Sequence, residues 1–167
     1  RDADRAPGDF APPLQPYEEV REFFYARHDH MATLDERAEQ LYETVTRGAP
    51  AGAADAATLL ARLRLRLQEQ HGVTVRETAA DRTSDQALRS YDAASRTISL
   101  ATDMDPAQQA FQLGVQLAFL ETGPLIDAFT TPDASTTSQA RSLARLGFAN
   151  HFAGALVLPN RRFQDAA

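Results

Sequence analysis

The sequence predicts an α+β fold in which a helical layer packs on a small three-stranded antiparallel sheet. Apolar residues recur at helical spacing both early and late in the chain of 167 residues. Between these parts, the segments 73–78, 88–92 and 96–100 have the length and composition of strands, and a short turn would join the last two as a hairpin. A chain of this length indicates a single domain.

Local signals set the limits of the expected helices. The segment 63–67 alternates like a strand, but its leucines also fit one helical face and Gly72 is a typical helix end, so we expect a helix. His28–His30 interrupts an apolar pattern, and Pro159 should end the last helix. Helices are therefore expected at 17–27, 33–47, 55–70, 106–121 and 138–158, with a further apolar turn at 125–129, and with Leu143, Leu146, Ala149, Phe152, Ala153 and Leu156 as the core stripe of the last helix.

Composition excludes several classes of function. Hydrophobic residues make up 43% and charged residues 24%, as in soluble globular proteins, and no run of apolar residues is long enough to span a membrane. The lack of cysteine excludes disulfides, thiolate metal sites and iron–sulfur clusters within this chain, and the cytoplasm is the expected compartment. A net charge of −6 argues against nucleic-acid binding by this part alone.

The first sixteen residues differ in composition from the rest. Residues 1–16 are rich in Asp, Ala, Arg and Pro without periodicity, which is typical of a linker. We therefore expect the domain to comprise residues 17–167. Both ends resemble the boundaries of a middle piece from a longer protein.

The segment Phe111–Glu121 is the most informative part of the sequence. It is apolar on most sides, follows Pro106 and stops before Gly123-Pro124, so it predicts a core helix. In zinc peptidases of the HExxH type, such a helix carries two metal-binding histidines one turn apart, and the catalytic glutamate follows the first. Here these positions are Val115, Gln116 and Phe119. We interpret the chain as a degenerate, zincin-like metallopeptidase frame without the metal ligands.

Other groups give an enzyme little support. The chain has no cysteine nucleophile, no Gly-x-Ser-x-Gly turn and no phosphate-binding loop. His28 and His30 could form a metal pair, but polar residues closing a loop are the simpler interpretation. His151 lies in an apolar segment, where a core histidine with one partner and a pocket residue are equally good interpretations.

Polar residues on apolar helices point instead to ligand binding. Gln112 and Gln116 lie one turn apart on one helical face, and Asn150 and His151 interrupt a second apolar segment. An apolar pocket with a few convergent polar groups is typical of a small-molecule site. A structural network of buried amides explains the glutamines equally well.

Four segments taken together resemble a known family. They are Pro16–Arg27, Leu34–Glu39, Phe111–Glu121 and Leu143–Pro159. In this order and spacing they are similar to the middle domain of the actinobacterial short-chain fatty-acyl transcriptional regulators, a domain that is itself similar to the ImmA/IrrE metallopeptidases.

The resemblance implies a function, although this chain departs from the related proteins at single positions. Such regulators carry an N-terminal helix-turn-helix, a sensor domain for coenzyme A or short acyl-CoA esters, and a C-terminal cysteine-bearing segment that can hold an iron–sulfur cluster. The third metal ligand of the peptidases is a glutamate, and this chain has Gly147-Phe148 where that glutamate would stand. Members of the sensor family often have histidine at the position of Val115 and tyrosine at that of His151.

We therefore expect a non-catalytic, acyl-CoA-binding domain that reaches DNA only through another domain, does not bind membranes and forms a homodimer. The expected ligand contacts are Phe111, Val115, Phe119 and Phe152 for the acyl chain, Gln112, Gln116, Asn150 and His151 for polar groups, and Arg27 for phosphates. The alternatives are a ligand-free dimerisation module and a divergent metallopeptidase that uses His28, His30 and His151.

Overall fold

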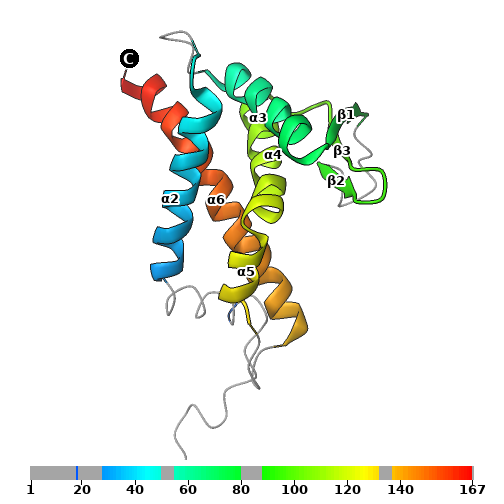
Figure 1. Ribbon diagram of the computed structural model, residues 1–167, viewed down its shortest axis with the longest axis vertical. Coiled ribbons are helices and arrows are strands. Elements are labelled where there is room, and N and C mark those ends of the chain that lie inside the picture. Colours follow the sequence, from blue (N-terminus) through cyan, green and yellow to red (C-terminus); the bar gives the residue numbers. More distant parts are fainter. Residues whose placement is uncertain (1–17, 19–27, 50–54, 80–87, 132–136, 167) are drawn as a thin grey trace, which may run out of the picture.

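The structure, a computed structural model, describes residue 18 and residues 28–49, 55–79, 88–131 and 137–166. Its helices are α2 (His28–Thr46), α3 (Ala56–His71), α4 (Pro106–Glu121), α5 (Gly123–Phe129) and α6 (Ser138–Ala166), and its strands are β1 (Thr74–Thr78), β2 (Arg89–Asp92) and β3 (Thr97–Ala101). The predicted α+β class is confirmed. In Figure 1, α2, α6 and α4 lie beside one another, α3 crosses one end of them, and the sheet lies on the far side of α3 and α4 from α2.

The sheet is mixed, so the prediction that all three strands are antiparallel is wrong for β1. The three strands lie in the order β1-β3-β2, with β1 parallel to β3 and β2 antiparallel to it. The hairpin between β2 and β3 is as expected. The most apolar strand, β3, takes the centre, where its Ile98, Leu100 and Ala101 are fully buried. The more polar β1 and β2 form the edges.

Two predicted helix limits are also wrong. His28–His30 forms the first turn of α2 rather than a break, and Asp29 in that turn is favoured by the helix dipole. At the other end, α6 runs on past Pro159 to Ala166, because a proline removes a single backbone donor and can bend a helix without ending it. The predicted helix 17–27 lies outside the described residues apart from residue 18, which is helical.

The predicted core stripe of α6 is partly wrong. Leu143 and Leu146 are 38% and 40% exposed. The buried face starts at Ala140 and Ala144 and continues through Phe148, where α6 meets both α2 and α4. Small alanines allow this close approach, and the bulkier leucines beside them point away from it.

Helix α4 forms the centre of the packing. Asp105 caps its first turn in a capping box with Gln108. Pro106 stands in that first turn, as the sequence predicts. Gly114 faces α6 so closely that a Cβ atom there would lie 3.1 Å from the Cβ of Ala153 and 3.3 Å from its Cα. The two helix backbones are therefore in contact, which fixes the position of α4 against α6.

A polar cluster joins the end of α4 to α3. Arg66 donates from Nε and Nη2 to the two carboxylate oxygens of Glu121, at 2.8 and 3.0 Å, and His71 Nε2 lies 2.9 Å from Glu121 Oε2. Burial alone would raise the pKa of Glu121, but the hydrogen bonds and positive charges of Arg66 and His71 outweigh it and hold this pKa below its ordinary value. The cluster ties the core helix to α3.

The close contact at Gly114 leads to a first prediction. Gly114→Val should lower the free energy of unfolding by about 2 kcal/mol, because the added carbons must push α4 and α6 apart. Urea unfolding followed by circular dichroism measures this. Gly154 is the matched control: no atom lies within 4 Å of its virtual Cβ, so Gly154→Ala should stabilise by about 0.5–1 kcal/mol. Equal effects of the two substitutions would contradict the account.

The cluster around Glu121 predicts a pH-dependent contribution to stability. A carboxyl group whose pKa is lowered on folding stabilises above its unfolded pKa, near 4.5, and loses this effect as the pH falls through its folded pKa. Glu121→Gln should therefore cost about 1–2 kcal/mol at pH 7 and progressively less below pH 4.5.

The control for this prediction is Glu77→Gln. Glu77 pairs with Arg64 at 2.9 Å, but its side chain is 48% exposed, so its loss should cost no more than about 0.5 kcal/mol. Urea unfolding of each variant at pH 7 and pH 3.5 gives both numbers. A deficit for Glu121→Gln that is the same at both pH values would show that its charge does not stabilise the fold.

Candidate functional site

The peptidase motif positions of α4 are largely apolar and mostly buried. Val115 is only 1% exposed, and Phe119, one turn later, is half-buried. The guanidinium carbon of Arg145, on α6, lies 5.6 Å from the centre of the Phe119 ring, within range of a cation–π interaction. This face therefore presents two apolar side chains where two histidines would be needed to bind zinc.

Beside this face, both predicted glutamines are bound by one arginine of the sheet. Arg89 Nε donates to Gln112 Oε1 at 3.1 Å, and Arg89 Nη1 donates to Gln116 Oε1 at 2.6 Å. Gln116 is 5% exposed, and the half-buried Arg89 reaches it from the edge strand β2. The two amides, one turn apart on α4, thus hold a guanidinium between the helix and the sheet.

The charge of this network is not neutralised by the partners of Arg89. Burial lowers the pKa of Arg89, which reflects the cost of removing a charged guanidinium from water. Its two partners are neutral amides, and no carboxylate in the described part of the chain bonds to it. Partly buried charges are normally compensated by an opposite charge. The network therefore leaves a net positive charge beside the apolar face of α4.

Arg89 is the residue that the sequence analysis missed. Within the predicted strand, alternation places Arg89 and Tyr91 on one side, and both are partly buried, whereas Leu88, Ser90 and Asp92 are exposed. A charged residue on the inward side of a strand was the available signal. A pocket and a structural network were equally good interpretations of the glutamines. The structure shows them in a network, and the hydrogen-bond donors that this network leaves unused belong to Arg89.

The other predicted contact residues, apart from Phe111, do not lie on α4. Asn150 is exposed on α6. His151 Nε2 lies 2.8 Å from Asp35 Oδ1, a contact that joins α6 to α2. Phe152 is 1% exposed and lines a hollow on the α2 side of the molecule. Phe111 is half-buried on α4, whereas Arg27 lies outside the described residues.

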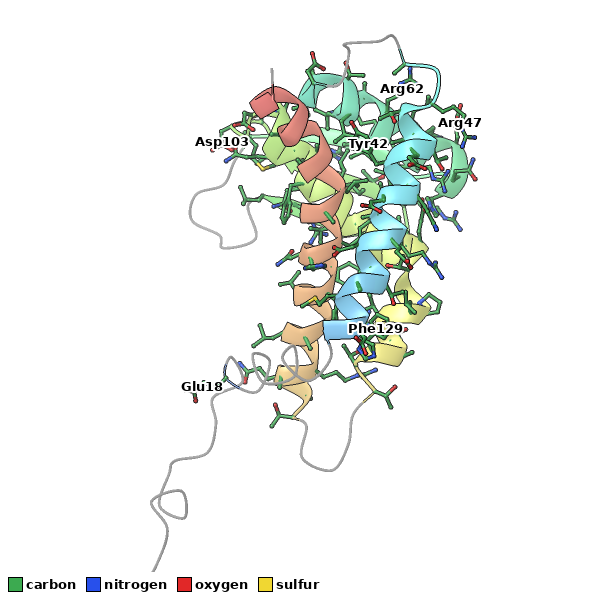
Figure 2. All side chains as sticks on the ribbon, turned by 90° about the vertical axis from the view of Figure 1, so that its left-hand side faces the viewer. Glu18, Tyr42, Arg47, Arg62, Asp103 and Phe129 are labelled. Atoms are coloured by element: carbon green, nitrogen blue, oxygen red, sulfur yellow. The ribbon has the colours of Figure 1, made fainter. Side chains whose placement is uncertain are left out.

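The histidines are used in separate places. The ring of His30 stacks on Phe129, with 3.8 Å between centroids and 2° between planes, and Figure 2 shows Phe129 beside the first turn of α2. His71 contacts Glu121 and His151 contacts Asp35. Within the described residues, no group of three or more His, Cys, Asp or Glu side chains could hold a metal ion. The side chain of His28 lies outside the described part.

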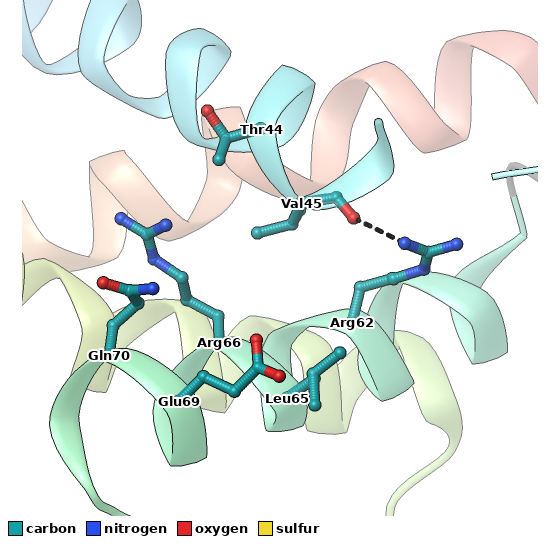
Figure 3. Close-up of a pocket in the computed structure, with 7 residues that line it drawn as sticks. All are labelled: Thr44, Val45, Arg62, Leu65, Arg66, Glu69 and Gln70. Atoms are coloured by element: carbon teal, nitrogen blue, oxygen red, sulfur yellow. Dashed lines mark hydrogen bonds between the residues drawn. The ribbon is translucent and has the colours of Figure 1, made fainter. Parts of the chain in front are cut away.

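A polar groove runs between α2 and α3 (Figure 3). It has a volume of about 240 Å³, and a second hollow of about 190 Å³ shares Thr44 and Arg66 with it and reaches Phe152. Its arginines already have partners: Arg62 donates to the carbonyl oxygen of Val45 at 3.5 Å, and Arg66 binds Glu121. Both arginines of this groove thus bond to groups on neighbouring helices, Arg62 to α2 and Arg66 to α4.

None of the described helices is both long and apolar enough to cross a membrane.

Comparison with known proteins gives consistent results. The model of the IrrE N-terminal-like domain, a peptidase M78 family, matches residues 68–167. The chain is 41% identical over 152 residues to the HTH-type transcriptional regulator RamB and 36% identical over 158 residues to the HTH-type transcriptional regulator PrpR, both of Mycobacterium tuberculosis. It is 33% identical over 159 residues to a propionyl-CoA carboxylase regulator of Cereibacter sphaeroides. These matches cover 91–93% of this chain.

A solved structure agrees with the sequence matches. A transcriptional regulator of Mycobacterium tuberculosis superposes with a TM-score of 0.73 at 34% identity, over 92% of this chain and 44% of that one. The chain spans about 30% of the length of the curated relatives, so it corresponds to one part of them. The expected resemblance to an ImmA/IrrE-like domain of such regulators is confirmed. The chain belongs to the IrrE N-terminal-like domain family.

Proposed function

We propose that this chain is the ligand-sensing domain of a transcriptional regulator and that it binds coenzyme A or a short-chain acyl-CoA without catalysing a reaction. The observation that carries the proposal is the chemistry of α4. Apolar side chains occupy the metal-ligand positions Val115 and Phe119, and a neutral amide, held by Arg89, occupies the catalytic position 116. Such a surface suits an acyl chain and its polar attachment better than it suits zinc.

The relatives supply the direction of the proposal. Two of them are HTH-type transcriptional regulators by name, and the third is named as a propionyl-CoA carboxylase regulator. A regulator of an acyl-CoA-consuming enzyme gains a direct signal if it binds that class of molecule. Binding would then bias a two-state equilibrium of the regulator, because a ligand shifts such an equilibrium through its different affinity for the two states.

The ligand would lie along the outer side of α4. Phe111 and Phe119 are half-buried and remain available for an acyl chain, whereas Val115 backs them in the core. DNA would be reached through a domain beyond this chain, in keeping with its net charge of −6. We further propose that the regulator works as a homodimer in the cytoplasm.

A second candidate, an interaction module without a ligand, is favoured by one observation. Leu143 and Leu146 lie one turn apart on α6 and are 38% and 40% exposed. An exposed pair of large apolar residues is a typical part of a protein–protein contact. Sedimentation of the wild-type protein and of Leu143→Ser/Leu146→Ser tests this candidate. It requires a wild-type dimer that the double variant loses.

The sensing proposal predicts specific, chain-length-dependent binding. Calorimetric titration with CoA, acetyl-, propionyl- and butyryl-CoA should give saturable heat. Phe119→Ala should raise the Kd of butyryl-CoA about tenfold, because it removes an apolar contact worth about 1.4 kcal/mol, and should change the Kd of free CoA less than about threefold. Val115 is less suited to such a test, because a larger residue at this core position would strain the packing.

Leu65→Ala is the matched control. Leu65 lies on α3 and is 49% exposed, so its truncation removes apolar surface from the groove between α2 and α3 rather than from α4. It should leave the binding of every CoA species unchanged. Absence of heat and of thermal stabilisation with all four molecules would reject the sensing proposal.

A further inference from the structure

The half-buried arginines of the described residues differ in how their charge is balanced. Arg62 and Arg141 donate to backbone carbonyl oxygens. Arg66 pairs with Glu121, Arg145 pairs with Asp127, and Arg64 pairs with Glu77. Arg89 instead bonds to the amide oxygens of Gln112 and Gln116. Amide oxygens orient a guanidinium but do not neutralise it, so the full positive charge remains.

The geometry also leaves donors unused. A guanidinium has five N–H groups in a planar fork. Arg89 donates one N–H from Nε and one from Nη1 to the two glutamines. The other three N–H groups have no partner among the described residues. Because both glutamines come from one rigid helix, one turn apart, the plane of the guanidinium is fixed before any ligand arrives. Prior orientation of this kind lowers the entropy cost of binding.

The position of Arg89 connects it to the apolar face of α4. Gln112 and Gln116 alternate along the helix with Phe111, Val115 and Phe119. The strand that carries Arg89 is at the edge of the sheet and continues into exposed Ser90. A ligand with its apolar part against the phenylalanines would therefore have a fixed guanidinium beside it.

We propose that Arg89 is a specificity-determining residue that binds a negatively charged, oxygen-bearing group of the ligand, a phosphate or a carboxylate, with the donors that Gln112 and Gln116 leave free. The assignment to acyl-CoA ligands rests on the function proposed above. Arginine suits this role because its fork binds carboxylates and phosphates through two parallel hydrogen bonds. The glutamines serve as positioning residues that aim the guanidinium.

The anion could come from either end of an acyl-CoA. The nucleotide part carries phosphates, and a dicarboxylic acyl group carries a carboxylate. The two sources are separated by comparing propionyl-CoA with propionyl-pantetheine, which lacks the nucleotide phosphates, and with methylmalonyl-CoA, which adds a carboxylate to the same acyl chain.

Calorimetric titration of the wild type and of Arg89→Gln with these three molecules tests the inference. If Arg89 binds a phosphate, the variant should bind propionyl-CoA at least tenfold more weakly and propionyl-pantetheine unchanged. If it binds the acyl carboxylate, the loss should be at least tenfold for methylmalonyl-CoA and less than twofold for propionyl-CoA. Arg89→Lys keeps the charge without the planar fork and should recover only part of the loss.

Arg76→Gln is the control for net charge. Arg76 lies exposed on β1 of the same sheet, so its substitution removes one positive charge without touching the network. It should change each Kd less than twofold. Circular dichroism and the unfolding midpoint of every variant establish that the fold is intact, and Gln112→Leu provides a second route, because it disturbs the aim of Arg89 while leaving its charge.

The result that overturns the inference is distinct from failure of the proposed function. Wild-type binding that Arg89→Gln leaves unchanged for all three molecules would refute the role of Arg89 and leave the sensor intact. If the wild type binds none of them, the sensing proposal fails. The anion-binding role of Arg89 is then tested with inorganic pyrophosphate alone. A saturable shift of the Arg89 Nε–H NMR signal with pyrophosphate would support an anion site, and an unmoved signal would overturn it.

Discussion

The contact between α4 and α6 at Gly114 is the constraint on which the rest of the structure depends. With Ala153 3.1 Å from where a Cβ would stand, the two helices meet backbone to backbone. This contact fixes how α4 is rotated. Its other sides are then set: one faces α3, to which Glu121 is tied by Arg66 and His71, and another faces the sheet, where Arg89 binds the two glutamines.

In a zinc peptidase of the HExxH type, the active-site helix of such a frame holds a metal cation with histidines. In this chain the corresponding helix carries apolar residues, and the cation next to it is a guanidinium supplied by β2 and fixed by Gln112 and Gln116. A guanidinium cannot activate water as zinc does, but it can bind an anion. This arrangement supports the proposed role in ligand recognition, and the named relatives of the chain are regulators.

The sequence was sufficient for features that depend on local chemistry. The limits of α4 follow from Pro106 and Gly123, the end of α3 follows from Gly72 in its left-handed conformation, and the hairpin of β2 and β3 follows from its turn. Features set by distant contacts were not accessible. The parallel pairing of β1 with β3 depends on burial of the central strand, and the exposure of Leu143 depends on how α6 is rotated between two helices. The role of Arg89 depends on the sheet meeting α4.

Hydrogen–deuterium exchange with and without propionyl-CoA tests the central claim most directly, because it reports where the ligand acts without any substitution. The account predicts that saturating propionyl-CoA slows exchange in peptides covering Phe111–Glu121 and Arg89–Asp92, with little change in the exposed turn of α3 around Leu65. Protection confined to the groove between α2 and α3, or no protection anywhere, would contradict the claim that the face of α4 is the sensing site.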